Sequence, residues 1–127
     1  MGITVYVAEP DAAQRRWVEG TLAPHVESVC GVDSAAALLG LLHDGEQSCL
    51  IVDLSPDAAA PLALVQQMRA RGIAMPVIAL GPADTLRSAV DLARMAHTDY
   101  LPRPVSAGQL RAAVQRACGP RSTRRPS

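Results

Sequence analysis

The sequence is poor in aromatic residues: its 127 residues include no Phe, one Trp and two Tyr. The interior of this chain must therefore be aliphatic and rich in Ala. Twelve basic and twelve acidic residues give a formal net charge of zero, so the domain as a whole offers no positive field for nucleic acid. Basic side chains cluster only in the tail, at Arg121, Arg124 and Arg125, where the default interpretation is a solvated end.

Cysteines, long apolar runs and nucleotide-binding motifs are also scarce. The chain has three cysteines, Cys30, Cys49 and Cys118, and no CxxC pair, which predicts reduced thiols and a cytoplasmic location. No apolar run approaches the roughly 20 residues needed to cross a bilayer, so no membrane association is expected. The absence of GxGxxG and P-loop patterns argues against dinucleotide or NTP chemistry.

Short β-rich runs alternate with amphipathic runs along the chain. The predicted strands are 3–8, 26–32, 49–54, 75–81 and 98–104, and the predicted helices are 11–22, 33–45, 60–72, 83–96 and 106–118. Strict alternation of β and α predicts a parallel sheet with helices on both faces. We expect one α/β domain over residues 1–118, followed by a flexible tail or the start of a linker at 119–127.

The third predicted strand, in "SCLIVDLSP", ends on a single acid, Asp53. Ligands of doubly wound sheets lie beyond the carboxyl ends of the strands. Glu9 follows the first predicted strand, Gly81 ends the fourth and Arg103 lies at the end of the fifth. An acid at a strand end can be a mere turn former or helix cap, but the convergence of two carboxylates and a guanidinium favours a site. Carboxylates suit Mg²⁺, and an aspartate beside the ion can attack phosphorus.

Four segments, "VYVAEPD", "LIVDLSPD", "MPVIALG" and "DYLPRPV", carry a resemblance to a known family. In this order and at these separations, the chain resembles a receiver domain of bacterial two-component response regulators, CheY-like in type and most similar to the FixJ-like group. The resemblance covers residues 3 to about 118. It implies a flavodoxin-like (βα)5 fold, a doubly wound five-stranded parallel sheet with strand order 2-1-3-4-5.

The resemblance also implies roles for individual residues. Asp53 is the phosphoacceptor, and Tyr100 is the aromatic switch residue. The implied Mg²⁺ ligands are Glu9, Asp53 and the backbone carbonyl of Ser55. The family's Lys-Pro bond implies a cis peptide between Arg103 and Pro104.

The departures from the family's pattern fall in the pocket. Pro10 stands where the family supplies its main metal-binding carboxylate, and proline has no side-chain oxygen. Asp11 comes one position later, where we expect it to cap the first helix, although its carboxylate could also reach the pocket. Gly81 lacks the expected hydroxyl, and Arg103 keeps the charge of lysine but changes its shape to a planar fork. We therefore expect Mg²⁺ binding to be weak or absent.

The leading hypothesis is an atypical receiver domain that signals by protein–protein interaction or dimerisation, with weak or absent phosphorylation of Asp53 and no enzymatic activity. Glu9 and Arg103 could then pair with Asp53 as a resting ion-pair cluster that needs neither metal nor phosphate. One alternative is a conventional Mg²⁺-dependent receiver, phosphorylated on Asp53 by a histidine kinase. Another is a small flavodoxin-like enzyme or ligand-binding protein whose pocket only resembles that of a receiver.

The expected partners are a histidine kinase or another signalling protein, and a transcription-regulating DNA-binding domain beyond residue 127. A homodimer could form through the face made by the fourth helix, the fifth strand and the fifth helix. The expected apolar contributors to that face are Met95, Tyr100, Leu101 and Val105. Trp17 is expected to anchor either the core or an interface.

Overall fold

The computed structural model describes residues 2–32, 47–54, 59–81 and 98–118. The predicted helices over 33–45 and 83–96, the tail at 119–127, Ser55 and Met95 lie outside the described residues. The described elements are β1 (Thr4–Ala8), α1 (Ala12–Leu22), the 3₁₀ turn η1 (Ala23–His25), β2 (Ser28–Val32), β3 (Ser48–Asp53), α3 (Ala59–Ala70), β4 (Val77–Gly81), β5 (Thr98–Pro102) and α5 (Ala107–Cys118).

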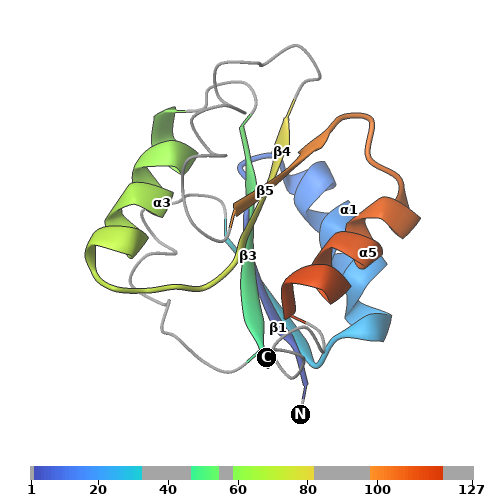
Figure 1. Ribbon diagram of the computed structural model, residues 1–127. Coiled ribbons are helices and arrows are strands. Elements are labelled where there is room, and N and C mark those ends of the chain that lie inside the picture. The colour runs from blue at the N-terminus through green and yellow to red at the C-terminus, as the bar shows by residue number, and fades with distance from the viewer. Residues whose placement is uncertain (1, 33–46, 55–58, 82–97, 119–127) are drawn as a thin grey trace.

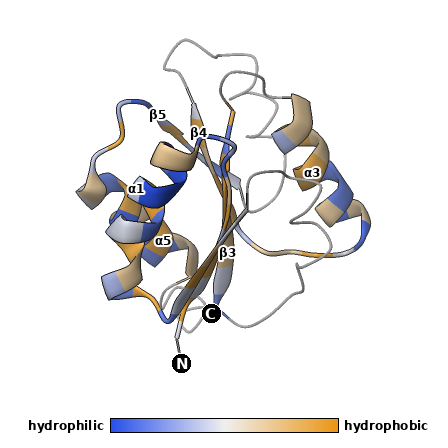
Figure 2. Ribbon diagram, turned by 180° about the vertical axis from the view of Figure 1, so that it is seen from behind, coloured by the Kyte–Doolittle hydropathy of each residue, from blue (hydrophilic) through white to orange (hydrophobic). Residues whose placement is uncertain are grey.

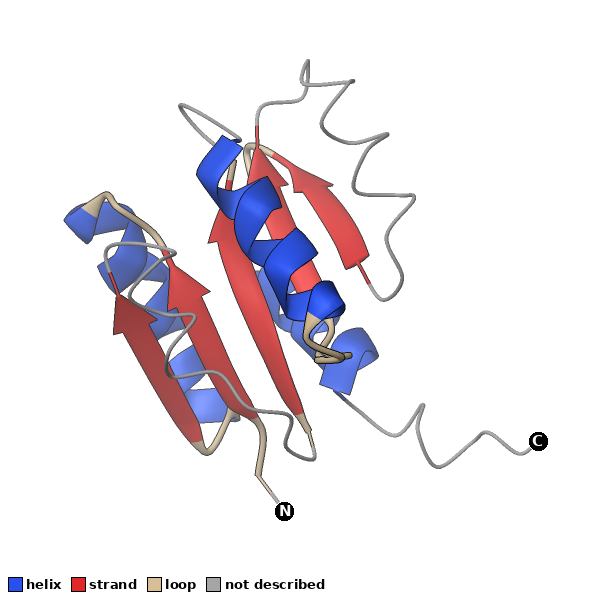
Figure 3. Cartoon of the chain, turned by 90° about the vertical axis from the view of Figure 1, so that its left-hand side faces the viewer, coloured by secondary structure: helices blue, strands red, loops and turns tan. Residues whose placement is uncertain are grey.

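The five strands form one sheet in the order β2-β1-β3-β4-β5. Every neighbouring pair is parallel, so the arrows in Figure 3 all point the same way. β3 is the central strand, with β1 on one side and β4 on the other, and all six of its residues are buried. The flavodoxin-like fold class and strand order predicted from the sequence are therefore confirmed.

The sheet separates two layers of helix. In Figure 1, α1 and α5 cover one face and α3 covers the other. Side chains along each strand alternate between the two sides: Leu50 and Val52 belong to the core cluster that includes α3, whereas Cys49 and Ile51 pack in the cluster that includes α1 and α5. Figure 2 shows the apolar colouring concentrated along the strands and the inner faces of the helices.

Local sequence signals explain where the helices begin and end. Ser106 and Gln109 form a reciprocal capping box at the start of α5, in which each side-chain oxygen accepts a hydrogen bond from the other residue's backbone N–H. α3 ends because Gly72 adopts a positive φ of 80°, a conformation that glycine enters without steric cost. The N–H of Ile73 then donates to the carbonyl of Met68 at 2.9 Å, which closes the helix end.

The cysteines are free, as the sequence predicted. Cys49 of β3 and Cys118 at the end of α5 are buried, and Cys30 is half-buried. A side-chain hydrogen bond with Cys118, together with burial, raises the pKa of the Cys49 thiol well above its ordinary value. Within the described residues, no helix combines the length and apolar character needed to span a membrane.

The position of α5 matters for the site because the helix follows directly from the loop that carries Arg103. Leu110 anchors α5 and is fully buried against the sheet. Leu110→Ala should lower the free energy of unfolding by about 2–5 kcal/mol, measured by urea denaturation. Gln115→Ala is the matched control on the exposed face of α5 and should change it by less than about 0.5 kcal/mol. Equal effects of the two substitutions would contradict this packing of α5.

Candidate functional site

Three charged side chains meet at the carboxyl edge of the sheet. Glu9 directly follows β1, Asp53 is the last residue of β3, and Arg103 directly follows β5. Both acids are nearly inaccessible, with Glu9 exposed by 3% and Asp53 by 7%. The parallel order of the strands brings these ends together, although the residues lie far apart in the chain.

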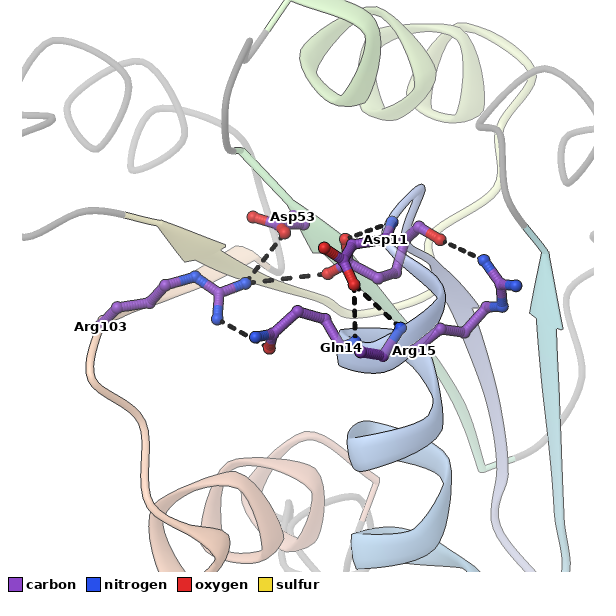
Figure 4. Close-up of polar contacts among 7 residues, drawn as sticks. Asp11, Gln14, Arg15, Asp53 and Arg103 are labelled. Carbon is purple, nitrogen blue, oxygen red and sulfur yellow. Dashed lines mark hydrogen bonds and ion pairs between the residues drawn. The ribbon is translucent and has the colours of Figure 1, made fainter.

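Arg103 bridges the two acids, and Figure 4 shows its guanidinium reaching Asp53 and Gln14. Its Nη2 lies 2.9 Å from Oδ2 of Asp53 and 3.8 Å from Oε1 of Glu9. Its Nη1 donates to Oε1 of Gln14 on α1 at 3.4 Å. The backbone N–H of Arg103 donates to the carbonyl of Gly81 at 2.7 Å, so the residue is held against the end of β4. The expected cis peptide between Arg103 and Pro104 is present.

Glu9 is the most perturbed group of the site. Burial, above all, raises the pKa of its carboxyl to about 7, and a side-chain hydrogen bond with Asp53 and repulsion by that carboxylate act in the same direction. The N–H of Asp11, which donates to Oε2 at 3.1 Å, and the charge of Arg103 oppose the shift. The Glu9 carbonyl accepts from Nη1 of Arg15 at 2.7 Å, which ties the end of β1 to α1.

Asp11 caps α1. Its Oδ1 accepts hydrogen bonds from the N–H groups of Ala13 at 2.9 Å and Gln14 at 3.0 Å, which satisfies two donors of the first helical turn. The capping role predicted from the sequence is confirmed, and the carboxylate is not among the groups that contact Arg103. Pro10, which lies between Glu9 and Asp11 in the chain, is exposed. In the part of the chain that the structure describes, no three His, Cys, Asp or Glu side chains gather as a metal-binding group.

The remaining predicted site and surface residues lie on different faces. Gly81 is buried at the end of β4, and Tyr100 packs on the α3 side of the sheet. Leu101 and Val105, expected on an exposed apolar face, pack against the core cluster beneath α1 and α5. Trp17 is not part of the core: its exposure of 38% makes it the exposed large apolar residue among those described.

An open cleft of about 620 Å³ lies beside the charged cluster. Its lining comes from the first turns of α1 and from the loop after β5, and consists of Ala13, Gln14, Trp17, Arg103, Pro104 and Val105. Trp17 and Arg103 therefore line the same cleft. Sequence reasoning missed this neighbourhood, because nothing in the α1 pattern indicates that its exposed face adjoins the loop after β5.

Solved structures of other proteins share this fold. The receiver domain of Francisella response regulator 1452 superposes with a TM-score of 0.75 at 19% identity, covering 91% of this chain and 95% of that one. Full-length FixJ from B. japonicum gives 0.77 at 24%, covering 90% and 56%. NtrX from Brucella abortus gives 0.79 at 21%, covering 93% and 27%. The chain has the fold of a response regulator receiver domain.

Sequence comparison finds a similar protein among transcriptional regulatory proteins. The chain is 27% identical over 117 residues to the transcriptional regulatory protein TctD of Salmonella typhimurium, with 89% of this chain covered. It spans about half the length of this curated relative, 52%. No protein-family model matches the chain.

The pKa of Glu9 predicts a pH dependence of stability. The carboxyl of a glutamate in an unfolded chain has a pKa near 4.5, against about 7 in the folded protein, so in this interval the folded state holds a proton that the unfolded state has lost. The contribution of Glu9 is complete below pH 4.5 and is lost as the pH rises through 7. Relative to Glu9→Gln, the wild type should lose roughly 2–3 kcal/mol of unfolding free energy between about pH 5 and about pH 8.

Urea denaturation at several pH values measures this difference. Glu27→Gln, which neutralises an exposed carboxylate at the opposite end of the sheet, is the control and should preserve the wild-type slope. A wild-type profile parallel to that of Glu9→Gln would show that Glu9 titrates normally in the folded protein.

Proposed function

We propose that this chain is an atypical receiver domain of a bacterial two-component response regulator, spanning residues 1–118, which signals through protein–protein interaction with little or no phosphorylation of Asp53. One observation carries the proposal: Asp11, the acid nearest to Glu9 in the chain, is used to cap α1. Glu9 and Asp53 are then the carboxylates that contact Arg103.

Charge in the pocket supports this function. Receiver domains generally bind Mg²⁺ at the phosphorylation site, and Mg²⁺ requires several oxygen ligands in near-octahedral geometry. Here Pro10 contributes no side-chain oxygen, and the guanidinium of Arg103 already lies within ion-pair distance of both acids. The positive charge of Arg103 repels a divalent cation and neutralises part of the charge that would attract one. The residues described here therefore do not fit a tightly held Mg²⁺.

The same contacts limit phosphoryl transfer. Asp53 must present a free carboxylate oxygen to phosphorus, but Oδ2 is bound to Arg103 at 2.9 Å within a nearly buried cluster. A phosphoryl group on Asp53 would also gain no hydroxyl hydrogen bond from position 81, because Gly81 has no side chain. Asp53 thus serves mainly as the anion that holds Arg103, and with it the loop after β5, against the end of β3.

The cleft lined by Trp17 supports the proposal that the domain signals by binding a partner protein. Trp17 is an exposed aromatic residue next to a charged cluster, a composition found where proteins bind partners. The partners that we propose are a histidine kinase or another signalling protein, with a homodimer as a further arrangement. In the full-length protein we propose a DNA-binding domain beyond residue 127, and free cysteines favour a cytoplasmic location.

Phosphorylation can be tested directly on the purified chain. After incubation with Mg²⁺ and a small acyl phosphate donor, intact-mass spectrometry should show at most a minor fraction carrying one phosphoryl group. The variant Pro10→Asp/Gly81→Thr restores a carboxylate and a hydroxyl, and should be phosphorylated to a much larger extent. Asp53→Asn in that background removes the acceptor and should abolish the adduct.

A Mg²⁺ titration separates binding from transfer. Trp17 is the only Trp in the chain and lines the same cleft as Arg103, so its fluorescence reports on the site. Pro10→Asp should increase Mg²⁺ affinity roughly tenfold or more over the wild type, because it adds a carboxylate.

Stoichiometric phosphorylation of the wild-type chain, lost in Asp53→Asn, would instead establish a conventional phosphoacceptor receiver.

A further inference from the structure

Gly81 is a glycine for reasons of space and not of backbone conformation. Among the described glycines, the positive φ belongs to Gly72, not Gly81. Gly81 is the last residue of β4, in parallel register with Pro102 of β5. The strand conformation there would accept any L-residue, so the absence of a side chain must be explained by what lies next to it.

The phenol of Tyr100 occupies that space. A Cβ placed on Gly81 would lie 3.1 Å from the Tyr100 hydroxyl oxygen, 3.3 Å from Cε1 of the same ring and 3.2 Å from Cβ of Leu54. Tyr100 pairs with Ala79 on β4 and packs against the core cluster on the α3 side. Its ring therefore extends across β4, and its hydroxyl ends over Gly81, beside the residue that follows Asp53.

We propose that Gly81 and Tyr100 form a fixed pair, in which the missing side chain at position 81 holds Tyr100 inward whatever the chemical state of Asp53. This inference deepens the proposed function and rests on it. The surface around β5 then presents one conformation to a partner, and no phosphoryl group is needed to select it. A change at Asp53 can move the Tyr100 ring only if it interacts differently with two ring positions, and position 81 has no side chain that could carry such a difference.

The steric argument ranks substitutions at position 81. Gly81→Ala places a methyl group at the tight distances given above, so the neighbours must move by a few tenths of an ångström. Leu54 is buried next to β3 and yields little, whereas the Tyr100 side chain can rotate about its own bonds. Gly81→Thr adds two further heavy atoms in the same place, and the phenol must leave.

Exposure of the Tyr100 ring is the readout. The chain has two tyrosines and no Phe, so labelling the tyrosine rings with ¹³C gives NMR signals from Tyr6 and Tyr100 alone. Tyr6, exposed by 8%, is the internal reference, and Tyr100→Phe assigns the signals. A soluble paramagnetic agent should broaden the Tyr100 signal several-fold more in Gly81→Thr than in the wild type, with Gly81→Ala in between.

Treating the wild type with Mg²⁺ and the phosphodonor should leave the Tyr100 signal unchanged. Equal broadening in the wild type and both variants, with Tyr6 still protected, would overturn the fixed pair. So would a wild-type Tyr100 signal that moves on phosphorylation. Gly81→Ala keeps the comparison decisive if Gly81→Thr does not fold. Because ring exposure is measured without phosphate, this proposal can fail while the chain remains unphosphorylated, and it can hold if phosphorylation proves stoichiometric.

Discussion

The burial of two carboxylates side by side is the constraint on which the site depends. Removing charged groups from water is costly unless they are paired, and Glu9 and Asp53 are both nearly inaccessible. Arg103 supplies one compensating charge, and the raised pKa of Glu9 supplies a proton near neutrality. The guanidinium and the proton together neutralise the negative charge of the two carboxyl groups. The ion pairs of Arg103 also hold the loop after β5 at the ends of β1 and β3.

The departures at the site differ in how much they say about function. All twelve basic residues of the chain are Arg and none is Lys, so an arginine at position 103 follows a preference of the whole sequence. Pro10 and Gly81 are specific to their positions. Pro10 has no side-chain oxygen, whereas Gly81 leaves room for the phenol of Tyr100. In the proposed function, these two residues therefore carry more weight than Arg103.

The same packing explains which predictions held and which did not. The continuously apolar run from Cys49 to Val52 predicted a strand, and the structure has β3 at Ser48–Asp53 with every residue buried. The pattern at Asp11 predicted a helix cap, which the hydrogen bonds confirm. Leu101 and Val105, expected to contribute to an exposed apolar face, are half-buried and pack against the cluster that includes α1 and α5. Trp17 was expected to anchor either the core or an interface, and its exposure of 38% excludes the core, because Val18 and Leu22 are the buried residues of α1.

The sequence by itself determined the alternation of strands and helices, and hence that the acids and Arg103 would end up at one edge of a parallel sheet. Hydrophobic periodicity and end caps are local properties, and parallel connectivity leaves few topologies. Only the tertiary structure decided that Arg103 contacts both acids and that Tyr100 fills the space above Gly81. Such contacts depend on side-chain rotamers across strands distant in the chain, which no local pattern encodes.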